Sequence, residues 1–154
     1  MQTNTEISRH QISTKQINLM PSIGEVDIFR SLQLLPGVSG TSESTSGLHI
    51  RGGTPEQNLV LLDGIKVYNV EHFFGFFSAF NANAIKSVDL YKGAFPARYG
   101  GRLSGVIDMI GRTGSFNEIK GQVTANLLSA GGSIEIPFKK KFSLRKVFPL
   151  SKYN

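Results

Sequence analysis

The sequence predicts an α+β fold, in which a small mixed sheet carries short helices and long loops and is followed by one or two further strands. Short apolar runs separated by Gly, Asp and Asn turns are typical of short strands. One N-terminal segment instead has helical spacing and ends at a proline and a glycine. After Ser115 the pattern becomes a two-residue alternation of apolar and polar side chains. The length of 154 residues suits one domain with a hydrophobic core.

A helix is expected from about Glu25 to Leu35. Ser22 and Glu25 have the spacing of a capping box, in which a serine hydroxyl and a glutamate carboxylate accept hydrogen bonds from free backbone N–H groups. Pro36 and Gly37 end the helix, because proline disfavours helical geometry at the preceding residue and glycine accepts left-handed geometry. Three apolar residues share one stripe of this helix: Ile28, Leu32 and Leu35.

Four short strands are expected to belong to one small sheet. They cover residues 48–51, 59–62, 65–68 and 87–91. Asp63 and Gly64 separate the second strand from the third and tolerate the positive backbone angles of a tight hairpin. The unbroken apolar run at 59–62 indicates a strand that is covered on both faces.

Backbone turns are expected at the ends of these strands, where positive φ angles or the close approach of another segment leave no room for a Cβ atom. The residues concerned are Gly52, Gly53, Asp63, Gly64, Gly93, Gly100 and Gly101, with Gly105 close by. Ordinary turns of an α+β domain explain most of these glycines equally well.

Phenylalanines gather between the third and fourth strands, with five of the chain's eleven in eight positions ending at Phe80. Aromatic side chains usually pack in a core. The four that form two adjacent pairs cannot all point inward, so some are expected to contact a partner. These four are Phe73, Phe74, Phe76 and Phe77.

Two alternating segments follow, around Val123 and around Ile134, with a small-residue turn between them. The alternation fits either a pair of strands in a transmembrane barrel or a surface hairpin of a soluble sheet, and the pattern alone does not decide. From Lys139 the alternation is expected to stop. Residues 139–154 are therefore predicted to be a loosely attached basic tail, produced by a frameshift or truncation or present as a genuine solvated tail.

The net charge of +6 lies at one end of the chain. Eleven acidic and eleven basic residues balance over residues 1–138, and six Lys or Arg residues from Lys139 onward give the excess. The predicted folded part therefore has no basic surface of the kind that binds DNA or RNA, and no nucleic-acid partner is expected. The absence of cysteine excludes disulfides, thiolate zinc sites and cysteine nucleophiles.

Sequence motifs for catalysis or metal binding are missing. The three histidines are too scattered for a metal site, and no nucleophile elbow, phosphate-binding loop or dinucleotide-binding glycine motif follows a strand. We therefore expect no enzyme activity, no metal and no cofactor. The segment Met1–Asn18 lacks the layout of a signal peptide, and no apolar run approaches the roughly 18 residues of a membrane-spanning helix.

An ordered series of short motifs points to one protein family. The motifs are Ser31–Val38 (SLQLLPGV), Ile50–Gly53 (IRGG), Leu61–Gly64 (LLDG), Tyr91–Gly93 (YKG) and Arg98–Gly101 (RYGG). In this order and at this spacing they resemble the plug domain of TonB-dependent outer-membrane receptors. The resemblance runs from about Ile12 to Phe138.

The resemblance implies a domain organisation. Residues 1–11 are an N-terminal segment, 12–115 a plug domain, 116–138 the start of a transmembrane β-barrel, and 139–154 the basic tail. The fold class is then a small mixed-sheet plug followed by one or two strands of an incomplete outer-membrane barrel.

The resemblance also implies a function as the plug, or gate, of a receptor in the bacterial outer membrane. Such a receptor imports a scarce nutrient such as a ferric siderophore, a cobalamin or a glycan, through a barrel of about twenty-two strands. Its partners are the barrel, the ligand and TonB, the inner-membrane protein that pulls on a short box before the plug. Neither that box nor an export signal is visible before Ile12, so we expect a fragment that does not transport by itself. The alternative is a soluble or secreted interaction domain with a plug-like core.

Arg51 and Lys92 stand where the family places two cations that lie against carboxylates of the inner barrel wall and lock the plug. Typical relatives have arginine at the second place, so Lys92 replaces a forked donor with a point charge. Without a barrel, both side chains are expected to be exposed to solvent, because burying an unpaired charge is costly. The paired phenylalanines are expected to contact the barrel wall or the ligand.

Overall fold

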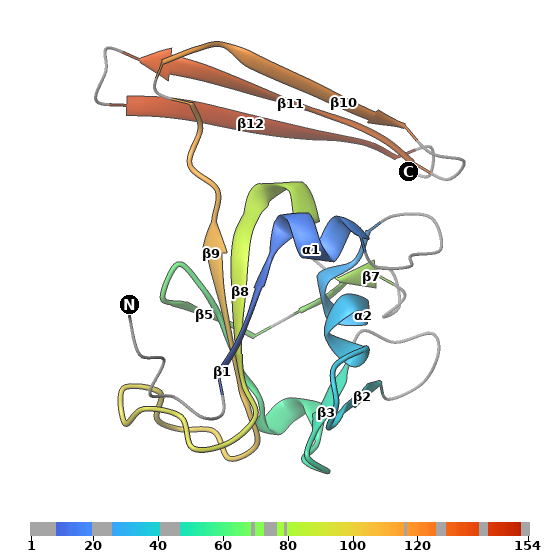
Figure 1. Cartoon of the computed structure of the whole chain (residues 1–154), viewed down its shortest axis with the longest axis vertical. Coiled ribbons are helices and arrows are strands. Elements are labelled where there is room, and N and C mark those ends of the chain that lie inside the picture. The colour runs from blue at the N-terminus through green and yellow to red at the C-terminus, as the bar shows by residue number, and fades with distance from the viewer. Residues whose placement is uncertain are drawn as a thin grey trace. The chain divides into compact units, whose positions relative to one another are not determined.

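The computed structural model describes residues 9–19, 26–40, 47–68, 70–72, 77–78, 80–115, 117–125, 129–138 and 142–151 (Figure 1). These residues form two compact units, with the main boundary between Gly111 and Arg112 and with Val26 grouped in the second unit. The first unit contains a five-stranded sheet, helices and two small hairpins, and the second is a three-stranded sheet.

The five-stranded sheet has the order β1-β8-β9-β4-β5. Its strands are β1 (Arg9–Ser13), β4 (Leu59–Leu62), β5 (Ile65–Val67), β8 (Ile85–Tyr91) and β9 (Val106–Gly111). Only β4 and β9 pair in parallel, so the sheet is mixed as predicted. The turn at Asp63 and Gly64 joins β4 to β5 with φ angles of 51° and 80°. Leu59, Val60 and Leu61 are all buried, which agrees with the prediction of a strand covered on both faces.

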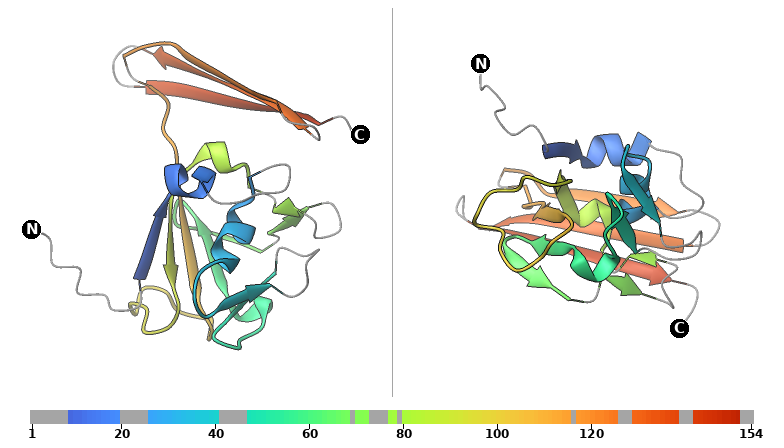
Figure 2. Two further views of the ribbon diagram at one scale, coloured as in Figure 1. Left: turned by 45° about the vertical axis from the view of Figure 1, so that its right-hand side comes forward. Right: turned by 90° about the horizontal axis from the view of Figure 1, so that it is seen from below.

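Two short helices lie on one side of this sheet, α1 (Thr14–Leu19) and α2 (Ile28–Gln33) (Figures 1 and 2). The core between them and the sheet is apolar and fully buried. It includes Ile17, Ile28, Phe29, Leu32, Val88, Leu90, Ile107 and Met109.

The predicted start of the second helix is wrong. The Asp27 side chain caps α2 by accepting hydrogen bonds from the backbone N–H groups of Phe29 at 2.8 Å and Arg30 at 3.1 Å. The helix therefore begins at Ile28, three residues later than expected, and Ser22–Glu25 lie outside the described residues. An aspartate at this position satisfies the same free N–H groups that a capping box would satisfy.

Two small hairpins complete the first unit, together with the short 3-10 helices η1 (Pro55–Gln57) and η2 (Ala82–Ala84). In one, β2 (Val38–Gly40) pairs with β3 (Leu48–Ile50); in the other, β6 (Glu71–His72) pairs with β7 (Phe77–Ser78). The prediction that residues 48–51 join the main sheet is therefore wrong. The turn after α2 brings β2 beside β3, and that neighbour takes the backbone pairing of β3.

The second unit is an antiparallel meander of β10 (Lys120–Ala125), β11 (Ser129–Phe138) and β12 (Phe142–Ser151). The predicted pair of alternating strands is present as β10 and β11. The prediction of a loosely attached tail is wrong for residues 142–151, because ten residues of β12 pair with β11 without a break. Ile136 lies opposite Leu144, and Ile134 lies opposite Lys146. Lys146 interrupts an alternation of Phe142, Leu144, Phe148 and Leu150 that continues the pattern of β11.

Candidate functional site

The first predicted lock residue, Arg51, directly follows β3 in a strained backbone turn. Its φ angle is 49°, and Gly52 continues the turn at 81°. A residue with a Cβ atom adopts this left-handed region at a cost of about 1–2 kcal/mol. Two backbone hydrogen bonds of 3.0 Å hold the turn, one from the Arg51 N–H to the Gly37 carbonyl and one from the Gly53 N–H to the Ile50 carbonyl.

The segment around Ser104 packs closely against the same turn. The Ser104 hydroxyl donates to the Ile50 carbonyl at 2.7 Å. A Cβ atom on Gly53 would lie 2.1 Å from the Ser104 Oγ, so only glycine fits at that position. The backbone N–H groups of Leu103 and Ser104 both donate to the Gln57 carbonyl at 3.2 Å. Contacts from distant segments therefore fix the backbone that carries Arg51.

The side chain of Arg51 is exposed, and its guanidinium lies against Gly93. A Cβ atom on Gly93 would lie 3.0 Å from the Arg51 Nη1 atom, and the φ angle of Gly93 is 132°. Both the space and the backbone angle therefore favour glycine here. The predicted site residues Arg51 and Gly93 meet although they lie 42 positions apart in the chain.

The second predicted lock residue, Lys92, is buried, so the expectation of an exposed side chain is wrong. Only 7% of Lys92 is exposed. Its Nζ atom donates to the Pro36 carbonyl at 2.8 Å. Burial lowers the pKa of His10, and the charge of Lys92 lowers it further. Lys92 therefore bonds a carbonyl of its own domain rather than a carboxylate.

The Arg51 site carries positive charge without a nearby counter-ion among the described residues. Among the residues that the structure describes, no carboxylate lies within ion-pair distance of Arg51 or Lys92. Within the same residues, no group of three or more His, Cys, Asp or Glu side chains is arranged to hold a metal ion. The arrangement is suited to binding a carboxylate from outside the described chain.

Comparison with known proteins identifies the family. The sequence matches the family described as TonB-dependent Receptor Plug Domain over residues 2–106. The chain belongs to this family. The resemblance of its motifs to plug domains is thereby confirmed.

Solved structures of outer-membrane receptors share the fold of this plug. The ferric enterobactin receptor PfeA from Pseudomonas aeruginosa, solved as the R480A mutant in complex with enterobactin, aligns over 93% of the chain with a TM-score of 0.65 and 22% identity. The ferric-catecholate import receptor Fiu from E. coli K12 aligns over 92% with a TM-score of 0.64 and 18% identity. The outer membrane transporter YddB from Escherichia coli aligns over 88% with a TM-score of 0.60 and 16% identity. The chain spans 24%, 20% and 25% of these three proteins.

The predicted turn residues of the plug differ in their geometry. Positive φ angles occur at Gly52, Gly64, Gly93, Gly101 and Asp63, while close approach restricts Gly53 and Gly105. Gly100 has neither restriction, since an added Cβ atom would meet nothing within 4 Å.

The structure does not describe the side chains of the four paired phenylalanines, Phe73, Phe74, Phe76 and Phe77. The described Phe80 stacks on Phe29 of α2 with ring centroids 5.9 Å apart.

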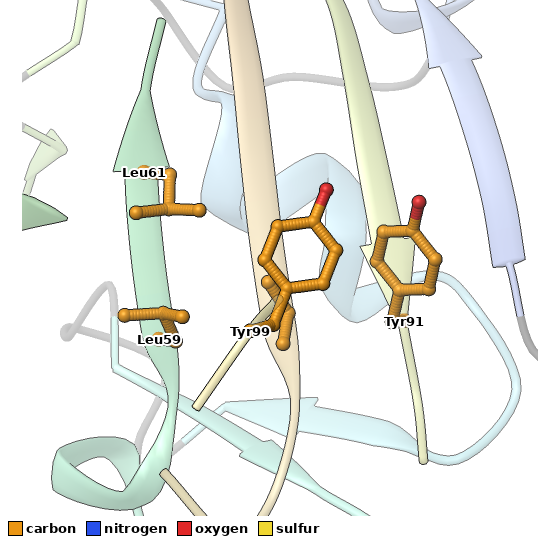
Figure 3. Close-up of a cluster of buried hydrophobic side chains, with 5 residues drawn as sticks. Leu59, Leu61, Tyr91 and Tyr99 are labelled. Carbon is orange, nitrogen blue, oxygen red and sulfur yellow. The ribbon is translucent and has the colours of Figure 1, made fainter. Parts of the chain in front are cut away.

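Sequence reasoning missed a polar network on the face of the plug sheet that bears Tyr91. The rings of Tyr91 and Tyr99 lie side by side, 5.2 Å apart, with their hydroxyl groups at the same end (Figure 3). The Tyr99 hydroxyl donates to Asp108 at 2.8 Å, and the Arg98 guanidinium lies 4.6 Å from the Tyr99 ring centroid. Burial and the bond to Asp108 raise the pKa of Tyr99 to about 12, although the contact with Arg98 acts in the opposite direction. The RYGG motif contains Arg98 and Tyr99 but does not reveal the hydrogen bond from Tyr99 to Asp108.

A second acidic residue stands beside this network. Asp89 of β8 lies directly opposite Asp108 of β9 in the strand register. Arg9 of β1 donates to the Asp89 carboxylate at 2.8 Å, so β1 supplies the charge that balances Asp89.

No helix within the described residues of the plug is long and apolar enough to cross a membrane.

Proposed function

We propose that this chain is the gating plug of an outer-membrane receptor that imports a scarce nutrient, such as a ferric siderophore, a cobalamin or a glycan. The plug closes the receptor barrel until ligand binds and TonB acts on a segment before the plug. The bacterial outer membrane is then the location of the whole receptor. Membership of the plug family supports this proposal, as does the fold shared with PfeA, named a ferric enterobactin receptor, and Fiu, named a ferric-catecholate import receptor.

The main observation behind the proposal is the exposure and the surroundings of the Arg51 side chain. Its guanidinium is exposed, its backbone is held in a strained turn, and the described chain offers it no carboxylate. An arginine fork binds a carboxylate with two parallel hydrogen bonds, which fixes both position and orientation. Arg51 therefore suits a contact that holds the plug against a carboxylate of the barrel wall.

The second unit supports the assignment of residues 116–138 as the start of the barrel. By the register of β10 and β11, three exposed apolar residues share one face of this sheet: Val123, Ile134 and Ile136. Ser133 belongs to the opposite face and is buried. An apolar outer face that alternates with polar inward positions is the pattern of a barrel strand in a membrane. We extend the assignment to β12, since its register continues that of β11.

The test is passive leakage through a full-length receptor that carries this sequence as its plug. Arg51→Ala removes the fork, so bacteria that express the variant are expected to admit an antibiotic too large for general porins. Arg51→Lys retains the charge but not the bidentate geometry and is expected to leak to an intermediate degree. Growth inhibition by the antibiotic measures the leakage.

The matched control is Lys86→Ala, which removes an exposed cation from β8 of the five-stranded sheet. This variant should remain as tight as the wild type. In the 154-residue chain alone, Arg51→Ala should change the free energy of unfolding by no more than about 0.5 kcal/mol, as for most surface substitutions. A receptor that stays closed to the antibiotic with Arg51→Ala would contradict the proposed lock.

A further inference from the structure

We propose that Lys92 is a positioning residue for Arg51 rather than a second lock. Its buried ammonium group holds the turn that carries the Arg51 backbone contact, and the adjacent Gly93 provides the surface on which the Arg51 guanidinium lies. The identity of the group that Arg51 contacts rests on the proposed function. The positioning of Arg51 by Lys92 does not, because it involves only residues of this chain.

Lys92 and Arg51 are linked by two hydrogen bonds, which they donate to neighbouring backbone carbonyl groups. Lys92 Nζ donates to the Pro36 carbonyl at 2.8 Å, and the Arg51 N–H donates to the next carbonyl, that of Gly37, at 3.0 Å. Both acceptors belong to one turn between α2 and β2. Displacement of this turn would therefore move the Arg51 backbone with it.

Burial makes the Lys92 contact strong and prevents Lys92 from reaching outward. A hydrogen bond with a charged donor is roughly twice as strong as a neutral one. Tyr91, which precedes Lys92, is fully buried and anchors the end of β8 in the apolar cluster with Leu59, Leu61 and Val106 (Figure 3). The Lys92 side chain thus starts from a rigid point, and its ammonium group is already engaged by a carbonyl.

The dipeptide of Lys92 and Gly93 affects Arg51 in two ways. Lys92 acts through the turn on the backbone of Arg51, while Gly93 leaves the space into which the guanidinium fits, 3.0 Å from where a Cβ atom would stand. Burial and, to a smaller extent, the charge of Lys92 lower the pKa of His10, which favours the neutral imidazole. Arg51 is thus the outward-facing cation of this group.

The first experiment measures amide hydrogen exchange in the 154-residue chain. Lys92→Met removes the donor but keeps an unbranched side chain of similar length. The exchange rate of the Arg51 amide is expected to rise at least tenfold, while the amides of Val88 and Leu90 in the sheet change much less. Lys92→Arg keeps a charged donor and is expected to restore the protection of the Arg51 amide. Lys86→Met is the matched control and should leave all these rates unchanged.

Two results of this experiment would overturn the inference. One is an unchanged exchange rate at Arg51 in Lys92→Met. The other is an equal increase at Arg51, Val88 and Leu90, which would show that Lys92 contributes only to global stability. If Lys92→Met does not fold, Lys92→Gln, which retains a neutral donor, is measured by the same comparison.

The second experiment is a double-mutant cycle in the full-length receptor. If Lys92 acts only through Arg51, the variant with both Arg51→Ala and Lys92→Met should leak no more than Arg51→Ala alone. Additive leakage would show an independent second lock and would overturn the inference. If Arg51→Ala does not leak at all, the proposed function fails, and the exchange experiment still decides whether Lys92 positions Arg51.

Discussion

Gly53→Ala provides a severe test of the close packing beside Arg51. The added Cβ atom would stand 2.1 Å from the Ser104 Oγ and 2.4 Å from the Ser104 Cβ. Rotation of the Ser104 hydroxyl could relieve the first contact but not the second, because the backbone fixes the Cβ atom. The segment that carries Ser104 must therefore move away from Gly53.

The expected loss of stability has two contributions. Movement of Ser104 breaks its 2.7 Å hydrogen bond to the Ile50 carbonyl, which is worth about 1 kcal/mol net, and the Ile50 carbonyl retains the Gly53 N–H as a second donor. Forcing extra volume into a packed site costs about 1–3 kcal/mol more. We therefore expect Gly53→Ala to lower the free energy of unfolding by about 2–4 kcal/mol.

Urea unfolding monitored by circular dichroism measures this difference. Gly100→Ala is the matched control, because its added Cβ atom meets nothing within 4 Å, and it should remain within about 0.5 kcal/mol of the wild type. Adding Ser104→Gly to Gly53→Ala removes the clash and should recover the part of the loss due to crowding. A Gly53→Ala variant as stable as the Gly100→Ala control would refute the packing argument, and so would a double variant with no recovery.

Three further perturbations test other parts of the plug. Asp27→Ala removes the cap of α2 and should lower the free energy of unfolding by about 1 kcal/mol in the same urea titration, with Asp27→Asn close to the wild type. His10 has a lowered pKa in the folded state, so the unfolded chain binds more protons and stability should fall as the pH drops below about 6.5. His10→Gln should make that decline shallower, as thermal unfolding at pH 7 and pH 5 would reveal, and equal slopes would contradict the shift. Tyr99→Phe leaves Asp108 without its donor and should remove, from an ultraviolet titration, a phenol that ionises near pH 12.

The parts of the fold that were predicted correctly depend on neighbours in sequence. The apolar run of β4 and the Asp63–Gly64 turn specify a strand and a hairpin within a few residues, and both are present. The start of α2 was misplaced because two polar groups, Ser22 and Asp27, each offered a suitable cap. Local signals thus predicted the type of each element better than its limits.

The features that could not be predicted depend on distant segments. Lys92 has the sequence context of an exposed charge at a strand end, but its partner, Pro36, lies 56 positions earlier in the chain. Asp89 and Asp108 become neighbours only through the pairing of β8 with β9. The strand β12 was not predicted, because a run of lysines interrupts the alternation of apolar and polar residues before it. The register of β12 with β11 makes the alternation evident. Motif order revealed the family, but not which charged side chain turns inward.

The three-stranded sheet has consequences for handling the protein. Within the described part of the chain, β10 and β12 each pair only with β11, so each has a row of backbone N–H and C=O groups along its other side without a strand partner. Such rows attract any extended chain, including the same sheet of another molecule, and promote aggregation at high concentration. The same rows are templates on which a following strand can form its hydrogen bonds one residue after another. Purification at low concentration, or in detergent micelles, suits a protein with two such edges.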